Sequence, residues 1–327
     1  MIKKDKTFII AEIGNNHEGS YKIAKKLISL AAKAKVNAVK FQTFKTEDYV
    51  NDKDQKRFER LKKFQLEEQE FIKLARYAKN KKLKFISTPF DIRSAIFLNK
   101  IVDCFKISSG DNNYFQLIEK VLSFKKHTII STGFLSYNEI KKLVAFIKKK
   151  RFPLSKLSLL HCVSAYPVKD SEANLNSISF LKKKLKISIG YSDHTIGTEA
   201  SVAATCLGAE IIEKHFTIDN NFSNFRDHKL SSNPEEMRKI VNLVRKTEKI
   251  LGKFDKNISK TEKVNKKSSR RSIFAKVEIK KNEKITHEKI KIVRPEEGLE
   301  PLMLSRIISK KVLKKINKSE PIKKKFK

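Results

Sequence analysis

"SIGYSDHTIG" (residues 188–197) is a short apolar run that ends in a hydroxyl, a carboxylate and an imidazole. Its first residues predict a buried strand, and Ser192, Asp193 and His194 stand where that strand ends. Burying polar groups is costly unless they find partners, so such an ending requires either a structural hydrogen-bond network or a ligand. The interpretation depends on whether other strands of the chain end in the same way.

Seven further β-rich runs of similar length occur along the first 252 residues, and amphipathic helix patterns lie between them. The runs are "TFIIAEIG" (7–14), "VNAVKFQT" (36–43), "KLKFISTPF" (82–90), "VDCFKISSG" (102–110), "HTIISTG" (127–133), "LSLLHCVS" (157–164) and "AEIIEKHF" (209–216). The helical patterns include 21–35, 138–150 and 233–252, the last with Asn233 as N-cap and Pro234 in its first turn. Apolar strands that alternate with helices indicate a parallel sheet, and eight such units match a (β/α)8 TIM barrel. A doubly wound sheet is the alternative, but no G-x-G-x-x-G follows the first strand.

The pattern changes after Gly252. The next stretch is polar and charged, and "RRSIFAKVEIKKNEKITHEKIKIVRP" (270–295) then shows short strands and turns. We therefore predict an α/β chain with a barrel domain at 1–252, a linker at 253–267 and a small β-rich domain at 268–327.

The net charge of +37 invites a nucleic-acid or membrane interpretation. The lysines are scattered along almost every predicted helix rather than gathered in one arm, which favours solvated helix faces and attraction for anionic substrates over a nucleic-acid platform. We expect no specific nucleic acid and no membrane as partner, since the amino terminus shows no long apolar segment. Cys104, Cys162 and Cys206 have no metal-type spacing, so we expect a cytoplasmic protein with reduced thiols.

Polar residues end all eight strands, and in barrels of this class the chemistry lies at those ends. The strand-end residues are Glu12, Lys40, Gln42, Thr88, Lys106, Ser109, Ser131, Ser164, Tyr166, Ser192, Asp193, His194, Glu213, Lys214 and His215. Lysines with hydroxyls suit a phosphate or a carboxylate. Two histidines on neighbouring strands could share a divalent metal, and two carboxylates could handle protons or bind sugar hydroxyls. Each residue alone also has an ordinary structural explanation; the joint pattern favours one pocket.

The motifs "IIAEIGNNHEG", "AVKFQTFK", "FISTPFD", "FKISSGD", "IISTGF", "LLHCVSAYP", "IGYSDHTIG", "IIEKHFTID" and "DHKLS" resemble, in order and spacing, the sialic acid synthase family. "RRSIFAKVEIKKNEKIT" with "IVRPEEG" looks like the family's C-terminal antifreeze-like (SAF) domain. The resemblance covers nearly the whole chain. It implies condensation of phosphoenolpyruvate with N-acetylmannosamine and water to give N-acetylneuraminate and phosphate, with C–O cleavage.

The resemblance also implies a role for each site residue. His194 and His215 would bind a divalent ion, Mn2+ or Mg2+, which would polarise the sugar aldehyde. Phosphoenolpyruvate would be held by Lys40, Thr88, Lys106, Ser109, Ser131 and Ser192, and Ser164 lies at a further substrate-binding position. The sugar would be contacted, or its protons transferred, by Glu12, Gln42, Tyr166, Glu213 and Asp227, beside a loop at 44–65. The active unit would be a homodimer with a swapped C-terminal domain, so that Arg294 reaches the sugar of the partner subunit.

Three alternatives remain open on the sequence alone. The sugar could be a 2,4-diacetamido-2,4,6-trideoxyhexose, which would make the product legionaminic acid. The chain could be a non-enzymatic anion- or nucleic-acid-binding protein, although strand-end polar residues favour an enzyme. A barrel aldolase with a Schiff-base lysine, Lys106 or Lys40, is the third alternative.

Overall fold

Eight parallel strands close into a barrel, as the sequence predicts. The computed structural model describes residues 6–324 and 327. The strands are β1 (Phe8–Gly14), β2 (Ala38–Thr43), β3 (Lys84–Pro89), β4 (Cys104–Ile107), β5 (His127–Ser131), β6 (Leu157–Cys162), β7 (Ser188–Asp193) and β8 (Ile211–His215). Pairing of β1 with β8, from Phe8 opposite Ile211 to Glu12 opposite His215, closes the ring.

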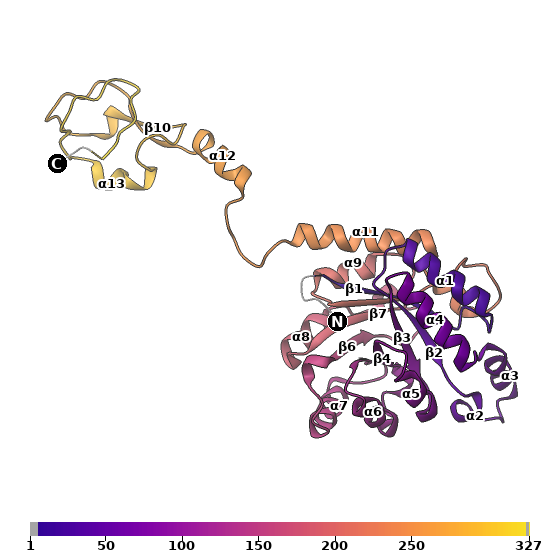
Figure 1. Cartoon of the computed structure of the whole chain (residues 1–327). Helices are drawn as coiled ribbons and strands as arrows, with labels where there is room; N and C mark the ends of the chain where they lie inside the picture. The colour runs from indigo at the N-terminus through magenta and orange to yellow at the C-terminus, as the bar shows by residue number, and fades with distance from the viewer. Residues whose placement is uncertain (1–5, 325–326) are drawn as a thin grey trace. The chain divides into compact units, whose positions relative to one another are not determined.

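Helices cover the outside of the barrel (Figure 1). They include α1 (Tyr21–Lys33), α4 (Glu68–Asn80), α5 (Ile92–Leu98), α6 (Phe115–Ser123), α7 (Tyr137–Lys149), α8 (Asn176–Leu185), α9 (Glu199–Cys206) and α11 (Pro234–Leu251). Helix α11 begins as its sequence predicts, because the Asn233 side chain accepts hydrogen bonds from the backbone N–H groups of Glu235 and Glu236. Its buried residues Met237, Ile240, Val241 and Val244 recur at helical spacing and face the core.

The stretch expected as a loop at 44–65 is largely helical. It forms α2 (Thr46–Tyr49) and α3 (Gln55–Phe64), and a further short helix, α10 (Arg226–Leu230), follows β8. Asp54 caps α3 by accepting a hydrogen bond from the backbone N–H of Arg57. Leu61 and Phe64 anchor the helix by burial.

The barrel interior is apolar at the amino-terminal ends of the strands and polar at the carboxyl ends. A separate interior cluster consists of Phe8, Ile10, Ala38, Ile86, Cys104, Ile129, Leu160 and Ile211. Side chains two residues apart on a strand share a face, so the next interior positions fall on polar residues. On β1 the interior series is Phe8, Ile10 and Glu12, and on β8 it is Ile211, Glu213 and His215. The strand pattern therefore places the charged side chains inside the barrel at one end.

The second compact unit spans Lys253–Lys327, and the first spans Met1–Gly252. The second unit contains α12 (Lys260–Ser269), the antiparallel pair β9 (Ser272–Ala275) and β10 (Ile290–Val293), and α13 (Leu304–Ile307). Its core is Ile273, Ala275, Ile279, Ile285, Ile290, Leu299, Ile307, Val312 and Ile322. The segment predicted as a linker thus carries a capped helix, α12, over most of its second half.

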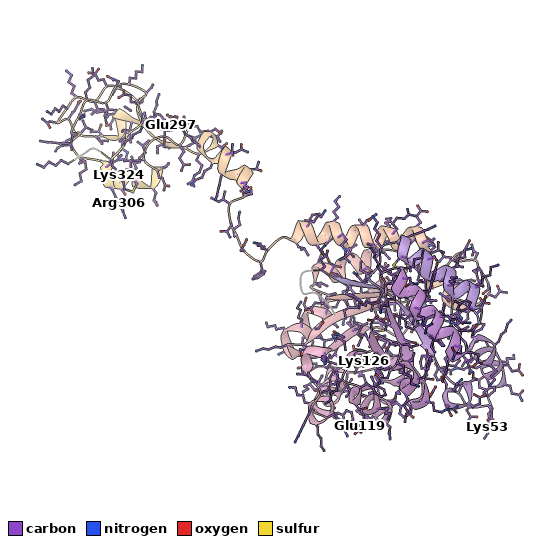
Figure 2. The ribbon with its side chains drawn as sticks, viewed as in Figure 1. Lys53, Glu119, Lys126, Glu297, Arg306 and Lys324 are labelled. Atoms are coloured by element: carbon purple, nitrogen blue, oxygen red, sulfur yellow. The ribbon has the colours of Figure 1, made fainter. Side chains whose placement is uncertain are left out.

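Charged side chains cover both units, among them Lys53 and Glu119 on the first and Arg306 on the second (Figure 2). Within residues 6–324 and 327, no helix is both long enough and apolar enough to cross a membrane.

Candidate active site

Four charged side chains form one buried cluster at the carboxyl ends of β1, β2, β4 and β8. Lys40 Nζ lies 2.8 Å from Glu12 Oε2 and 3.7 Å from Glu213 Oε1, and Lys106 Nζ lies 3.0 Å from Glu213 Oε1. The hydroxyl of Ser192 donates to Glu213 Oε1 at 3.1 Å. All four charged side chains are at most 5% exposed. The two positive charges of the lysines balance the two negative charges of the glutamates, and such pairing offsets the cost of burying charged groups.

Burial and pairing move the pKa values of this cluster in different directions. Burial raises the pKa of Glu12, although Lys40 opposes the shift. Burial also works against the ionised form of Glu213, but Lys106 and Lys40 outweigh it and lower the pKa of that carboxyl to about 2. Burial lowers the pKa of Lys106, and for Lys40 the two glutamates overcome burial and raise the pKa. Glu12 is therefore the carboxyl of the pair that binds a proton more readily.

Three serine hydroxyls converge beside the cluster. Ser131 is the last residue of β5, and Ser109 and Ser164 follow β4 and β6. Among the described residues, no hydrogen-bond partner reaches the buried Oγ atoms of Ser131 and Ser164. The backbone N–H of Gly133 donates to Ser109 Oγ at 3.2 Å. A Cβ at Gly133 would lie 2.3 Å from Ser164 Oγ and 2.6 Å from Ser109 Oγ, so only glycine allows this approach. Unpartnered hydroxyls beside two lysines fit the oxygens of a bound anion.

The two histidines lie next to each other. The ring centroids of His194 and His215 are 5.5 Å apart, and Tyr166 stacks on His194 at 4.3 Å. His194 Nδ1 is 2.9 Å from the carbonyl oxygen of Val163, which leaves Nε2 available. His215 Nδ1 is buried, and no hydrogen-bond partner reaches it within the described part of the chain.

This donor set fits a divalent ion that takes two imidazole ligands and completes its shell with water or substrate oxygens. Among the residues that the structure describes, no group of three or more His, Cys, Asp or Glu side chains is arranged to hold a metal. Burial and the neighbouring His194 keep the pKa of His215 well below its usual value, so the imidazole is neutral, as a metal ligand must be.

A cavity of about 530 Å³ opens above these groups. Its lining combines residues predicted for the site (Gln42, Ser109, Ser164, Tyr166, His215 and Asp227) with Asn15, Tyr49, Arg57, Arg60, Leu61, Phe64, Phe90, Ser108, Gly110, Phe134, Phe225 and Arg226. Asn15 is not among the residues predicted from the sequence. Its Nδ2 donates to Gln42 Oε1 at 2.9 Å, and its Oδ1 is buried without a partner. Gln42 Nε2 in turn lies 3.4 Å from Glu12 Oε1, so Asn15 extends the cluster toward the cavity.

The sequence matches known proteins over both units. The NeuB family matches residues 27–256, and the SAF domain matches residues 270–326. The chain belongs to the NeuB family. It is 35% identical to the N,N'-diacetyllegionaminic acid synthase of Campylobacter jejuni, over 97% of this chain and 99% of that protein. It is 31% identical to human N-acetylneuraminate-9-phosphate synthase, over 96% of this chain and 91% of that protein.

A crystal structure of N-acetylneuraminic acid synthetase from Leptospira borgpetersenii, in complex with citrate, superposes with a TM-score of 0.76. That alignment has 36% identity and covers 80% of this chain and 90% of that one. NeuB family membership confirms the resemblance seen in the sequence. The family includes sialic, legionaminic and pseudaminic acid synthases that condense phosphoenolpyruvate with a sugar, and this chain is an enzyme of that family.

Two strand-end residues of the NeuB domain face away from the barrel interior. Lys214 Nζ lies 2.9 Å from Asp193 Oδ2, and Ser201 and Thr195 donate to the same carboxylate. Lys214 directly follows Glu213, and Asp193 directly follows Ser192. Because adjacent side chains on a strand point to opposite faces, Lys214 and Asp193 point away from the interior that Glu213 and Ser192 face. They form a structural ion pair behind the site.

Arg294 lies in the other unit, exposed directly after β10 in the SAF domain. Thr88, also predicted for the site, is buried within the barrel, with its Oγ1 3.4 Å from Lys40 Nζ. Asp227 lies on α10, its Oδ1 3.3 Å from Arg226 Nε.

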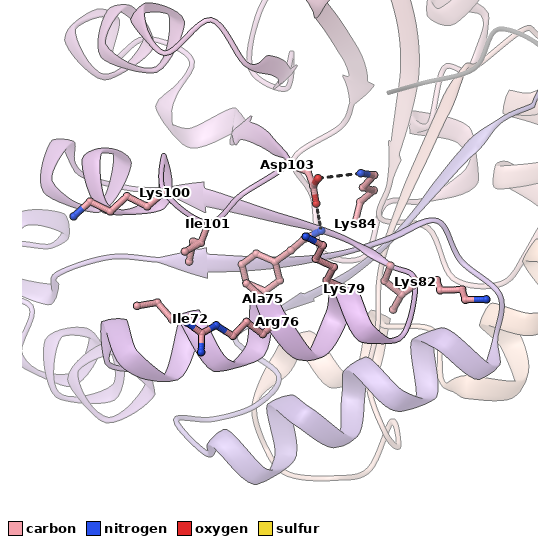
Figure 3. Close-up of a pocket in the computed structure, with 11 residues that line it drawn as sticks. Ile72, Ala75, Arg76, Lys79, Lys82, Lys84, Lys100, Ile101 and Asp103 are labelled. Atoms are coloured by element: carbon pink, nitrogen blue, oxygen red, sulfur yellow. Dashed lines mark hydrogen bonds and ion pairs between the residues drawn. The ribbon is translucent and has the colours of Figure 1, made fainter.

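A second hollow, of about 470 Å³, lies beside α4 at the amino-terminal ends of β3 and β4 (Figure 3). Lys84 Nζ is 3.0 Å from Asp103 Oδ1 there, and the backbone N–H of Phe85 donates to the same carboxylate. In the view, Lys82 and Lys100 extend away from the hollow. Its carboxylate is already paired, and this end of a barrel serves stability rather than catalysis.

Proposed function

We propose that the chain condenses phosphoenolpyruvate with an N-acylated hexosamine of the N-acetylmannosamine type and water, and forms N-acetylneuraminate and phosphate. One observation carries the proposal. Five buried polar atoms that find no hydrogen-bond partner among the described residues gather at the carboxyl end of the barrel: Asn15 Oδ1, Ser131 Oγ, Ser164 Oγ, Glu213 Oε2 and His215 Nδ1. Buried polar groups are nearly always paired in folded proteins, so a cluster of unpaired ones implies a polar ligand that completes them.

Phosphoenolpyruvate would lie over Lys40 and Lys106, with Ser109, Ser131, Ser192 and Thr88 as hydroxyl donors. Both lysines already point into the barrel and are held by the two glutamates, so little reorganisation is required when the anion binds. Ser164 faces the same space from the loop after β6 and would add another hydroxyl.

The reaction forms one carbon–carbon bond and breaks one carbon–oxygen bond. The double bond of phosphoenolpyruvate would supply its electron pair from carbon 3 to the sugar aldehyde, whose oxygen takes up a proton. Water would then add at carbon 2, and phosphate would leave with the bridging oxygen. A divalent ion, Mn2+ or Mg2+, held by His194 and His215 would supply a Lewis acid for the aldehyde oxygen. Glu12, oriented by Lys40 and Gln42, would exchange protons with the sugar, and Tyr166 and Asp227 would contact it.

We also propose that the active unit is a homodimer in which the SAF domain of each subunit completes the partner's site through Arg294. Arg294 is exposed directly before Pro295, where a turn that runs to Gly298 begins, and an arginine at such a turn suits contact with a ligand acyl group. The proposal includes a cytoplasmic location, which fits the three free cysteines Cys104, Cys162 and Cys206.

A legionaminic acid synthase is the second candidate. Aromatic side chains, namely Tyr49, Phe64, Phe90, Phe134 and Phe225, line the cavity and suit the methyl groups of a diacetamido-trideoxyhexose. The 35% identity to the Campylobacter jejuni synthase agrees with this alternative.

Phosphate release from phosphoenolpyruvate, measured with a panel of candidate hexosamines, tests the proposal. The expected product has the mass of a nine-carbon keto sugar acid, and 18O placed at the bridging position should appear in the released phosphate. Sugar-independent phosphate release, or label retained in the sugar acid, would overturn the mechanism. Borohydride with a keto substrate should leave Lys40 and Lys106 unmodified; a trapped lysine would instead support the aldolase alternative.

A further inference from the structure

The segment between β8 and α11, residues 216–233, brings part of the cavity lining into place on a very short helix. Helix α10 has only five residues, and helices of that length are not stable on their own in water. Its first two residues, Arg226 and Asp227, line the cavity of about 530 Å³. The position of Asp227 in the site therefore depends on contacts that other parts of the chain make with this segment.

The loop after β1 joins the two ends of the segment through Asn16. The Asn16 side-chain amide donates to the carbonyl oxygen of Phe216 at 2.9 Å, and the same nitrogen lies 3.0 Å from Ser231 Oγ. The Ser231 hydroxyl in turn donates to the carbonyl oxygen of Asp227 at 2.5 Å. These bonds fix the base of the segment and its return to the barrel.

The orientation of α10 between those ends is set by His228, which is 1% exposed. Both of its ring nitrogens have partners: Nδ1 lies 2.6 Å from Thr217 Oγ1, and Nε2 lies 3.0 Å from Glu18 Oε1. The Ser223 hydroxyl donates to the same oxygen of Glu18. Turning α10 about its axis would break at least one of these buried hydrogen bonds, which is costly.

The backbone of Glu18 indicates that its side chain has a role at this position. Glu18 has φ +47°, in the left-handed region that residues with a Cβ rarely adopt and glycine adopts readily. Gly19, the next residue, has φ +79°. A glutamate in this conformation is disfavoured unless its side chain offsets the cost, and the contacts with His228 and Ser223 do so.

We propose that Glu18 and His228 are positioning residues for the sugar, because their hydrogen bond holds α10 so that Asp227 faces the cavity. This inference rests on the function proposed above, in which Asp227 contacts the sugar. Neither Glu18 nor His228 is part of the cavity lining, so both act through Asp227. The residues proposed to hold phosphoenolpyruvate lie on or directly after β2, β3, β4, β5 and β7 rather than on this segment. Loss of the hydrogen bond should therefore affect the sugar and leave phosphoenolpyruvate binding intact.

Two substitutions of His228 separate its two hydrogen bonds. His228→Gln places an amide nitrogen near the position of Nε2 and keeps the bond to Glu18, whereas His228→Asn places its amide near Nδ1 and keeps only the bond to Thr217. The phosphate-release assay is run on the full chain with N-acetylmannosamine and with the diacetamido-trideoxyhexose. We expect Glu18→Ala and His228→Asn each to raise KM for the sugar that is turned over at least about tenfold, with KM for phosphoenolpyruvate unchanged. His228→Gln should restore most of this loss.

Glu248→Ala is the matched control. The Glu248 side chain is 17% exposed, compared with 23% for Glu18, and it pairs with Arg245 beside Thr7, next to the start of β1. Its removal should leave both KM values unchanged. Amide hydrogen exchange adds a measurement that does not require turnover: in Glu18→Ala, exchange within residues 217–231 should rise at least about tenfold while exchange in α11 stays as in the wild type.

The outcomes separate the two proposals. An unchanged KM for the sugar in Glu18→Ala, or equal increases in KM for the sugar and for phosphoenolpyruvate, overturns the positioning role and leaves the synthase function in place. A His228→Gln variant that is no better than His228→Asn also overturns it. Absence of turnover with every sugar, in wild-type protein whose circular dichroism shows an intact fold, overturns the synthase function. Unchanged hydrogen exchange at 217–231 in Glu18→Ala overturns the positioning role whether or not any sugar is turned over.

Discussion

Replacing Gly133 with alanine tests whether the serine cradle depends on close backbone approach. The added Cβ would lie 2.3 Å from Ser164 Oγ, 2.6 Å from Ser109 Oγ and 2.9 Å from Ser109 Cβ. Rotation about χ1 can move the hydroxyls away, but it cannot move a Cβ. Restoring an ordinary carbon–carbon contact of about 3.5 Å therefore requires one of the two backbone segments to shift by about 0.6 Å.

This shift should affect both stability and catalysis. Forcing an extra methyl group into a packed site costs about 1–3 kcal/mol, so we expect the free energy of unfolding to fall by that amount. A displacement approaching 1 Å at a substrate-positioning group can cost on the order of 100-fold in rate. Because Ser109 and Ser164 face the anion site, the loss should appear in kcat and in KM for phosphoenolpyruvate more than in KM for the sugar.

The assay is a double-mutant cycle with Ser109→Gly, which removes the Cβ that cannot rotate away. Urea unfolding of the two single variants and the double variant should show about 1–2 kcal/mol of favourable coupling. Gly110→Ala is the matched control: its Cβ would meet nothing closer than Ser108 Oγ at 3.6 Å, so its stability should change by less than about 0.5 kcal/mol. The steric argument is refuted if the unfolding free-energy changes of Gly133→Ala and Ser109→Gly add within about 0.5 kcal/mol in the double variant. It is also refuted if Gly133→Ala is as stable as the Gly110→Ala control.

Three further predictions follow from the site and its surroundings. Burial lowers the pKa of His17 to about 3. Between pH 7 and pH 5 this imidazole therefore binds a proton in the unfolded chain but stays neutral in the folded chain. The free energy of unfolding should fall by about 2 kcal/mol over that range. Urea unfolding of His17→Gln should lack this part of the decline, whereas the helix-cap variant Ser20→Ala should retain it. Chelation should abolish phosphate release and Mn2+ or Mg2+ should restore it, while His194→Ala loses most turnover with an unchanged circular dichroism spectrum; full activity in excess chelator contradicts the metal proposal. Mixing Arg294→Ala with His215→Ala subunits should recover up to about a quarter of wild-type activity if sites are completed in trans, and none if they are completed in cis.

The barrel was predictable because strand and helix periods are local properties of the sequence. Each apolar run between 7 and 216 became a strand, with ends shifted by at most three residues. The polar strand ends were equally visible, and simple alternation already separates Glu213 from its neighbour Lys214. What the runs could not show is which loops fold back over the barrel.

The loop-derived residues show that limit. Asp54 and the spacing of Arg57, Arg60, Leu61 and Phe64 are a recognisable helix signal, yet the direction of that face depends on packing against the barrel mouth. Asn15 contributes through a hydrogen bond to Gln42, 27 residues away along the chain. Gly133 matters because two other loops approach it. Such contacts join distant segments, and no local pattern encodes them.

The site has two layers of charged side chains with different roles, an inner layer in the barrel interior and an outer layer at the cavity mouth. In the inner layer Lys40 and Lys106 are neutralised by Glu12 and Glu213, so the lysines stay ordered and buried before any anion arrives. In the outer layer Arg57 and Arg60 line the mouth of the cavity, and among the described residues neither pairs with a carboxylate, in a chain of net charge +37. A field of that sign raises the local concentration of anionic substrates and is screened by salt, whereas the inner layer, shielded from solvent, is screened far less. Raising ionic strength should therefore increase KM for phosphoenolpyruvate with little change in kcat, and an equal fall in kcat would show that the inner layer is also open to solvent.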